Sequence, residues 1–311
     1  MTAHASQRLL VTGRSGFVGE TLASVLATTD HGQRWSLLDI PATLDLRDRD
    51  AITRFIAETR PDAVLHLAAQ SAVPESFRDP ETTLQINTLG TLHLLQALAA
   101  IDFRGRVLYI GTGEVYGLVP EAELPVAETR LPRPRNPYAV SKLAAEALCW
   151  QWHASQGMDV VLARPFNHIG AGQSDRFAVS DFAHQVAAIK RGLRPAVIRV
   201  GDLDVTRDFT DVRDVIEAYF ALLERGTAGE IYNVCSGAEH SMASILATLV
   251  ELGGIEVKIE TESQRLRPTE QRRMRGDAAK IRAATGWSAS TPLRASLRAA
   301  LQSWEESIAN E

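Results

Sequence analysis

The chain has 311 residues, of which 45% are hydrophobic and 23% charged, so it can form one large domain or two. Its formal net charge of -5 excludes the basic excess expected of a protein whose main partner is nucleic acid or an anionic membrane surface. The two cysteines lack C-x-x-C spacing, and the chain shows neither an apolar run of about 18 residues nor a signal-like start, which favours a cytoplasmic protein without a disulfide framework.

The first half alternates short apolar runs with helix-like segments. We expect strands at 9–11, 35–39, 63–67, 106–110 and 160–163, and helices at 16–28, 48–59, 82–100 and 138–156. Strands that alternate with helices predict a parallel sheet covered on both faces, which is a doubly wound α/β fold. Residues 117–137, rich in Pro and Glu, are expected to form a loop.

The second half is less regular. We expect helices at 181–191, 241–252 and 292–308, and a strand at 229–234 that can join the sheet. No Gly/Ser linker separates the halves, so a smaller C-terminal domain should interleave with the first. The predicted division assigns residues 1–165 plus about 206–236 to the sheet domain, and 166–205 plus 237–311 to the smaller domain.

A glycine-rich turn, TGRSGFVG at residues 12–19, lies between the first strand and the first helix. Gly13, Gly16 and Gly19 would permit a tight turn, close approach of a pyrophosphate and close helix packing. The phosphates would then meet the amides at the helix N-terminus. The spacing is G-x-x-G-x-x-G, so an ordinary glycine turn is the competing interpretation. The flanking strand and helix favour a dinucleotide site.

Two residues give opposite indications about the dinucleotide. Asp39 ends the second expected strand, where a carboxylate bonds the adenosine ribose and repels a 2′-phosphate, as in NAD sites. Arg14 at the turn can pair with that phosphate, as in NADP sites. NAD(P)H is therefore predicted without a choice between its two forms. Asp45 either bonds the adenine or caps the following helix.

Tyr138 and Lys142 stand four residues apart in a helix-like run, so the two side chains share one face. A neighbouring ammonium favours phenolate, and we expect it to lower the pKa of Tyr138. Such a phenol can exchange a proton with a sugar alcohol or ketone. Y-x-x-x-K alone is common in amphipathic helices, and its weight comes from Thr112 and the glycine turn.

TGRSGFVG, LHLAAQS, NTLGTLHLLQAL, IGTGEVYG, NPYAVSKLAAE and RPFNHIG occur in this order. In these motifs the chain resembles the extended short-chain dehydrogenase/reductase family over nearly its whole length. The resemblance implies a Rossmann domain and a catalytic trio of Thr112, Tyr138 and Lys142. It also implies cofactor contacts from Tyr138, Lys142 and a further set: Gly13, Ser15, Gly16, Phe17, Val18, Gly19, Asp39, Asp45, Leu46, Leu67, Ala68, Ala69 and Arg164.

The second half, with VGDLDVTRDFTDVRDV and RLRPTEQRRMRGDAAKIRAATGW, is similar to enzymes of this family that act on GDP-sugars. The resemblance implies either reduction of GDP-4-keto-6-deoxy-mannose to GDP-D-rhamnose or the 4,6-dehydration of GDP-mannose. Glu114 can serve as the base of a dehydratase, but Gly113 beside it cannot donate a proton. Reduction is therefore the preferred prediction. A non-catalytic NAD(P)-binding protein is the remote alternative.

Binding a nucleotide sugar requires positive charge beside its diphosphate. Arg207 is the expected phosphate fork, against the alternative that it pairs with Asp208 or Asp211. Further substrate contacts are expected from Ser71, Val73, Asn167, Arg267 and Glu270. His66 and His168 are expected to be packed or hydrogen-bonded, and no metal site is predicted. The apolar helices 82–100 and 138–156 suggest a homodimer.

Overall fold

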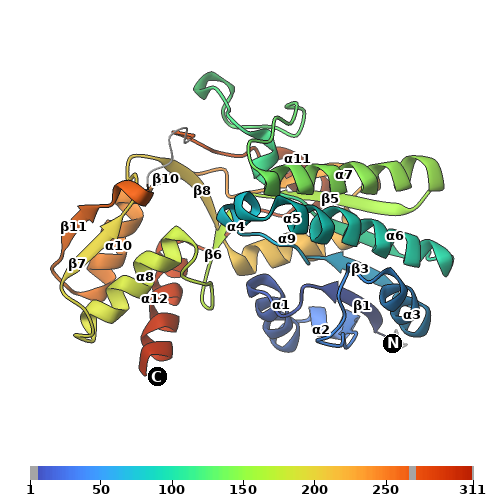
Figure 1. Ribbon diagram of the computed structural model, residues 1–311, viewed down its shortest axis with the longest axis horizontal. Helices are drawn as coiled ribbons and strands as arrows, with labels where there is room; N and C mark the ends of the chain where they lie inside the picture. Colours follow the sequence, from blue (N-terminus) through green and yellow to red (C-terminus); the bar gives the residue numbers. More distant parts are fainter. Residues whose placement is uncertain (1–5, 266–270, 310–311) are drawn as a thin grey trace.

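The computed structural model describes residues 6–265 and 271–309. Six parallel strands form its central sheet (Figure 1). Their spatial order is β2 (Trp35–Leu37), β1 (Gln7–Thr12), β3 (Ala63–His66), β4 (Arg106–Ile110), β5 (Asp159–Pro165) and β9 (Ile231–Val234). The chain reverses its direction of winding between β1 and β3, and in such sheets ligands bind beyond the carboxyl ends of the strands at this point.

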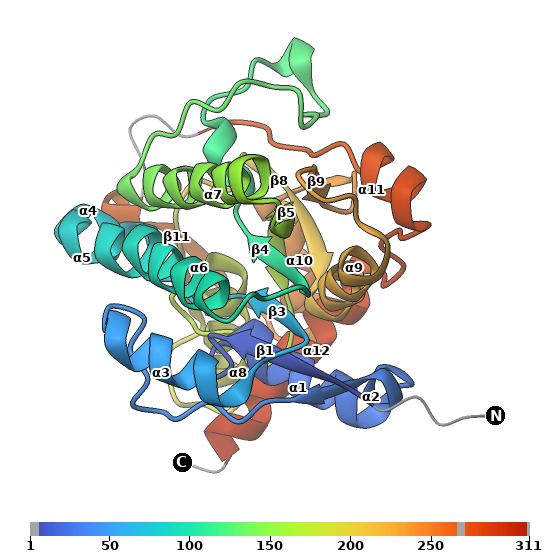
Figure 2. The same ribbon diagram turned by 90° about the vertical axis from the view of Figure 1, so that its right-hand side faces the viewer.

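Successive strand residues point to opposite sides of the sheet. Because the strands are nearly continuous apolar runs, both faces of the sheet are apolar. Leu9 and Val11 belong to one buried cluster, whereas Leu10 between them belongs to another. The first face is covered by helices α1 (Phe17–Thr28), α9 (Val212–Arg225) and α11 (Ala279–Thr285). The second is covered by α3 (Arg49–Thr59), α6 (Gly90–Ala100) and α7 (Pro137–Gln156), as Figure 2 shows. The predicted doubly wound α/β fold is confirmed.

A smaller part of the molecule has its own buried cluster. It contains a three-stranded sheet in the order β10 (Glu239–Ser241), β8 (Thr206–Asp211) and β6 (Asn167–Ile169). A two-stranded sheet pairs β11 (Lys258–Thr261) with β7 (Val197–Val200). Its helices are α8 (Ala178–Lys190), α10 (Met242–Gly253) and α12 (Leu293–Ala309).

The chain passes repeatedly between the two parts. It leaves the large sheet after β5, returns with α9 and β9, and leaves again at β10. β8 opens the segment 206–236, yet it pairs with β6 and β10 and not with the six-stranded sheet. The exact boundaries between the parts stay a prediction.

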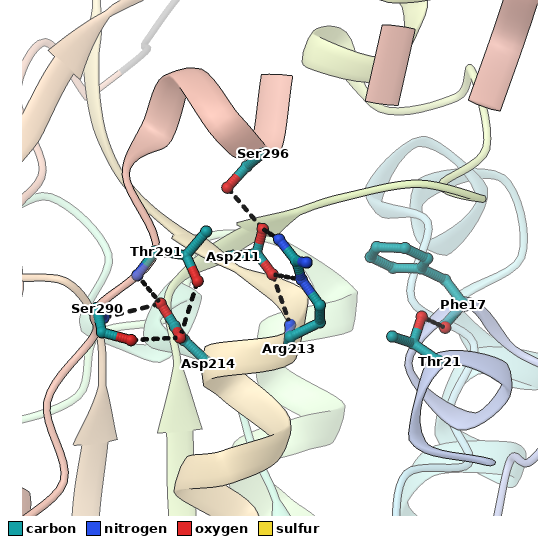
Figure 3. A network of polar contacts seen from close by, with 8 residues as sticks. All are labelled: Phe17, Thr21, Asp211, Arg213, Asp214, Ser290, Thr291 and Ser296. Carbon is teal, nitrogen blue, oxygen red and sulfur yellow. Dashed lines mark hydrogen bonds and ion pairs between the residues drawn. The ribbon is translucent and has the colours of Figure 1, made fainter. Parts of the chain in front are cut away.

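Two carboxylates at the start of α9 hold the segment that leads into α12 (Figure 3). Asp211 accepts from the Arg213 Nε at 2.8 Å and from the Ser296 hydroxyl at 2.6 Å. Asp214 accepts from the amides and hydroxyls of residues 290–291 at 2.7–3.2 Å. Because α9 covers the large sheet and α12 packs in the smaller part, these bonds connect the two.

Several elements differ from the expectations. The expected helix 82–100 is three pieces: α5 (Pro80–Leu84), a π-helical turn at Gln85–Leu89, and α6. The whole of α9 was not predicted, although its apolar residues recur at helical spacing from 212 to 223. Short helices also occur at α2 (His31–Arg34) and α4 (Val73–Arg78). Among the helices of the described residues, none is long and apolar enough to cross a membrane.

Candidate active site

An asparagine cap fixes the start of the helix that carries the tyrosine and lysine. The Asn136 Oδ1 accepts from the amide of Ala139 at 2.7 Å, and Pro137 occupies the first turn, where its missing N–H costs nothing. The Asn136 Nδ2 donates to the Glu114 carboxylate at 3.3 Å. One side chain thus orients both the start of α7 and the acid that follows β4.

The pKa of Tyr138 is raised to about 12, chiefly by burial. A hydrogen bond with the Thr112 side chain lowers this pKa, and the charge of Glu114 raises it. The expectation that Lys142 would lower it is wrong for this structure. The phenol is protonated at neutral pH, so it is set up as an acid.

The Lys142 ammonium lies over a tyrosine of the central sheet, Tyr109, and not beside the hydroxyl of Tyr138 that the sequence analysis expected. Its side chain is almost fully buried, and its ammonium lies 4.6 Å from the centroid of the Tyr109 ring. The Tyr109 hydroxyl donates to the Lys142 carbonyl at 2.9 Å, which ties this turn of α7 to β4. Burial lowers the pKa of Lys142 to about 8.

Thr112 follows the carboxyl end of β4 and is buried. Its hydroxyl accepts from the amide of Glu114 at 3.2 Å and caps a 3-10 turn, Gly113–Tyr116. An ideal Cβ on Gly113 would lie 3.2 Å from the Phe166 ring. Glu114 is exposed, and it is adjacent to a position that supplies no side-chain proton donor.

The glycine turn lies against the segment that follows β3. Gly13 has φ +75°, and a Cβ there would lie 2.7 Å from the amide nitrogen of Ala68. A Cβ on Gly19 would lie 2.5 Å from the carbonyl oxygen of Arg14. The turn therefore presents backbone to the crevice between β1 and β3, and the start of α1 supplies amides. This arrangement fits a dinucleotide pyrophosphate.

A buried histidine joins these two strands beneath the turn. Thr91 donates to the carbonyl of Asn87 at 2.6 Å, so its oxygen accepts from the His66 Nε2 at 2.9 Å. The His66 Nδ1 then accepts from the Thr12 hydroxyl at 2.6 Å, and Thr12 accepts from the amide of Ala68 at 3.3 Å. Burial lowers the pKa of His66 to about 3, which keeps the ring neutral.

A family model for GDP-mannose 4,6 dehydratase matches residues 41–299. The chain belongs to this family. It is 50% identical over 306 residues to GDP-6-deoxy-D-mannose reductase of Pseudomonas aeruginosa, a match that covers 98% of this chain and 100% of that protein. It is 30% identical to GDP-6-deoxy-D-talose 4-dehydrogenase of Aggregatibacter actinomycetemcomitans, over 88% and 90% of the two chains.

A solved structure shares the fold along the whole chain. RMD from Pseudomonas aeruginosa complexed with NADPH matches with a TM-score of 0.92 and 51% identity, covering 97% of this chain and 100% of that one. The predicted relationship to the extended short-chain dehydrogenases/reductases is confirmed, and the protein is an enzyme.

The other expected cofactor residues of this family member surround the turn. Ser15 lies in the turn itself, Phe17 and Val18 are the first two residues of α1, and the Phe17 ring stacks with that of His168 at 6.1 Å between centroids. Leu67 and Ala69 flank Ala68, and the Leu67 amide donates to the Thr12 carbonyl at 3.2 Å. These placements leave their cofactor contacts a prediction.

The residues that gave opposite indications about the dinucleotide bond each other. Arg14 pairs with Asp39 at 3.2 Å, and Asp39 is fully exposed two residues beyond β2. Asp45 is engaged by Arg47, whose hydrogen bonds lower the Asp45 pKa. Leu46 accepts through its carbonyl from the His93 Nδ1 at 2.9 Å, on α6.

Arg164 lies inside the protein and is not presented to the crevice. Its Nε and Nη2 donate to the two carboxylate oxygens of Glu146 at 2.9 and 2.6 Å. Its guanidinium stacks over the Tyr116 ring at 4.9 Å. The structure therefore gives Arg164 a buried partner that the sequence analysis did not consider.

The expected substrate residues of this family member converge from two strands of the smaller sheet. Asn167 on β6 donates to the Asp208 carbonyl at 3.3 Å, and Arg207 on β8 donates to the carbonyls of Thr206 and Gln271, both at 2.8 Å. Other donors engage the carboxylates of Asp208 and Asp211, the two acids considered as alternative partners of Arg207. Those of Asp208 are the Ser236 amide and hydroxyl and the amides of Gly237 and Gly276.

Two further expected contacts, Arg267 and Glu270, fall outside the described residues. Ser71 is exposed between β3 and α4, and Val73 is the first residue of α4. Both lie beyond the same edge of the sheet as the glycine turn.

Sequence reasoning missed Asn87, Asn136 and Glu146. Asn87 lies in the π turn, where its Nδ2 donates to the Ser141 hydroxyl at 2.9 Å and to the Gln70 carbonyl at 3.0 Å. Two of them carried a usable signal: Glu146 is four residues beyond Lys142 on the same helix face, and Asn136 followed by Pro137 is a typical helix start. The role of Asn87 depends on contacts with segments distant in sequence.

Proposed function

We propose that the protein reduces the 4-keto group of GDP-4-keto-6-deoxy-D-mannose to give GDP-D-rhamnose. The observation that carries this is the 50% identity to a GDP-6-deoxy-D-mannose reductase across the full length of that enzyme. The site agrees with it, since a protonated phenol, a buried lysine and a dinucleotide-type turn lie around the carboxyl ends of β1, β3 and β4.

A reduced nicotinamide dinucleotide, when bound, supplies the hydride that carbon 4 accepts. Tyr138 donates its proton to the carbonyl oxygen, and its pKa of about 12 keeps the proton available at neutral pH. The Thr112 hydroxyl hydrogen-bonds the same oxygen and polarises the carbonyl. Lys142 contributes a positive charge to the nicotinamide ribose and to the developing alkoxide.

The chain's own residues fit the dinucleotide at its phosphates and at its adenosine. The backbone from Gly13 to Gly19 would hold the pyrophosphate, with Ala68 on its other side. Arg14 would turn from Asp39 to a 2′-phosphate, whereas Asp39 would bond a free 2′-hydroxyl. A solved relative is complexed with NADPH. Both nucleotides belong in the assay.

The nucleotide diphosphate of the substrate would lie against Arg207 and Asn167. Both side chains reach the seam between the large and the small sheet, where β6 and β8 are paired. Arg267 and Glu270 complete the proposed set as phosphate and ribose contacts.

A dehydratase is the second candidate, because the matched family model bears that name. Glu114 would take the proton from carbon 5. The carbon 6 hydroxyl would then need a proton donor, and Gly113 offers none. We therefore place reduction ahead of elimination.

The test is to mix the purified protein with GDP-4-keto-6-deoxy-D-mannose and either NADPH or NADH, and to follow absorbance of the reduced nicotinamide. Oxidation of either nucleotide and formation of a GDP-6-deoxyhexose are expected. GDP-mannose without added reductant is the parallel arm. Turnover only in that arm would replace the reductase by the dehydratase, and turnover in neither would favour the non-catalytic binder.

We further propose a homodimer in the cytoplasm. Four large apolar side chains on α5, the π turn and α7 are 40–54% exposed: Leu84, Leu89, Val140 and Trp150. These elements pack side by side at one side of the molecule (Figure 2). A second copy that covers the same face would remove this surface from water.

A further inference from the structure

A buried ion pair lies directly behind Lys142. Glu146 is one turn further along α7, and both it and Arg164 are less than 5% exposed. Arg164, at the end of β5, donates to both oxygens of the Glu146 carboxylate. A bidentate pair of this kind holds the carboxylate in one orientation.

The backbone is shaped to admit this carboxylate. Gly111, between β4 and Thr112, is hydrogen-bonded to the Ala163 carbonyl at 2.7 Å. An ideal Cβ on Gly111 would lie 3.3 Å from the Glu146 Oε2. The absence of a side chain thus allows the pair to sit under the strand end that carries Thr112.

The surroundings of the ammonium contain few charges. Around Lys142 are His66 from β3, Tyr109 from β4, and Glu146 and Cys149 from α7, with Tyr138 one helical turn earlier on α7. His66 is neutral, and burial raises the pKa of Tyr109, Tyr138 and the Cys149 thiol, so these groups carry no charge at neutral pH. Glu146 remains as the anion, with Arg164 as its partner.

We propose that Glu146 and Arg164 are positioning residues that keep the Lys142 ammonium charged and in place beneath the reacting groups. Burial alone drives a lysine toward its neutral form. The Glu146 charge opposes this, and the two hydrogen bonds from Arg164 hold the carboxylate in one orientation. The inference rests on the proposed reductase function. It adds a positioning role for the ion pair, which the proposed function does not itself require.

The small number of lysines in the chain allows the titration of Lys142 to be measured directly. The sequence has four lysines, namely Lys142, Lys190, Lys258 and Lys280, and the other three are at least one-third exposed. Protein labelled with ¹³C at the lysine Cε should therefore give four resolvable NMR signals, one of them from a buried amine. In the wild type this signal should titrate near pH 8, the pKa of Lys142.

Glu146→Gln removes the charge and keeps the shape. The Lys142 midpoint should fall by about one pH unit or more, while the exposed lysines titrate unchanged. The alkaline limb of the kcat/KM profile should move to lower pH by the same amount, because less of the lysine is protonated. Arg164→Met is the second variant: it removes the two hydrogen bonds that orient the Glu146 carboxylate, so both readouts should move away from their wild-type values.

The matched control is Asp159→Asn. Asp159 and Arg106 form a bidentate pair at 3.0 and 3.1 Å between β5 and β4, and Asp159 lies at the opposite end of β5 from Arg164. This variant should lower the melting temperature without moving either titration. If Glu146→Gln and Arg164→Met lower stability but leave the Lys142 midpoint and the alkaline limb where they are, the pair is purely structural and the inference is wrong. If the wild type shows no reductase activity but Glu146→Gln still lowers the Lys142 midpoint, the proposed function is rejected and the inference about the ion pair stands.

Discussion

Tyr138 shows how a residue's chemistry depends on its surroundings. Four-residue spacing from Lys142 suggested a phenol made acidic by a cation, yet burial raises the Tyr138 pKa to about 12 and the lysine faces Tyr109. A reductase needs a proton donor at the carbonyl oxygen, and a phenol that retains its proton serves that purpose.

Replacing this phenol should remove the proton donor and little else. Tyr138→Phe is expected to lower kcat by about a hundredfold or more, the usual contribution of acid catalysis. The affinity for the dinucleotide, measured by fluorescence titration, should stay within a small factor. A variant that turns over at near wild-type rate would contradict the role of Tyr138.

His66 makes stability depend on pH. Its pKa is about 3 in the fold and about 6.5 in an unfolded chain. Between these values the unfolded state binds a proton that the folded state does not, so the free energy of unfolding falls as pH falls, by up to about 1.4 kcal/mol per pH unit.

In urea melts at about pH 7 and pH 5, His66→Gln should be less stable than wild type at the higher pH but should lose less on acidification. His240→Gln, at a partly exposed position in β10, is the control and should follow the wild type. Equal losses in wild type and His66→Gln would contradict the account.

Residues near the chemistry were partly readable from the sequence. The turn requires residues without side chains, and the glycines at positions 13, 16 and 19 show this directly in the sequence. The partners of Arg164 and Asp39 were not readable, because Glu146 and Arg14 meet them only after the sheet has formed. A long cationic side chain identifies a charge but not the anion that it meets.

Helix α7 is the element on which the site depends, and Asn136 sets its first turn. Asn136→Ala should cost about 1 kcal/mol of stability through loss of the cap. It should also lower kcat, because Glu114 loses its bond and Tyr138 is in the turn that frays.

Asp48→Ala is the comparison, since Asp48 caps α3 by accepting from the Ala51 amide at 3.0 Å, away from the site. The two variants should show similar losses in urea melts, and only Asn136→Ala should show slower turnover. Equal kinetics for both would mean that the cap has no role in the site.

Most elements with strong local patterns were predicted, α9 being the exception, and those set by tertiary contacts were not. The strands of the large sheet are continuous apolar runs, as strands buried on both faces must be. The π turn at 85–89 was not foreseeable, because its Asn87 bonds Ser141 and Gln70, which belong to other segments. The smaller sheets have short strands with mixed burial, and their sequence lacks a clear period.

At the scale of the whole molecule, the exposed apolar side of α5 and α7 is the proposed dimer interface. Trp150→Glu should shift the protein from dimer to monomer in light scattering coupled to gel filtration. Leu193→Glu, at an apolar residue 67% exposed after α8, should leave the mass unchanged. A wild type that is monomeric at high micromolar concentration would contradict the proposed dimer.

The four hydrogen bonds that converge on Asp208 link β8, the turn before β10 and the segment at Gly276. These stretches of chain cross between the large and the small sheet, so a single carboxylate secures several crossings. The border between the two parts should consequently open as one unit. The amides of Ser236, Gly237 and Gly276 should then exchange their hydrogens at a common rate. Closure on a nucleotide sugar would then proceed by rotation of intact bodies, with no local melting at their border.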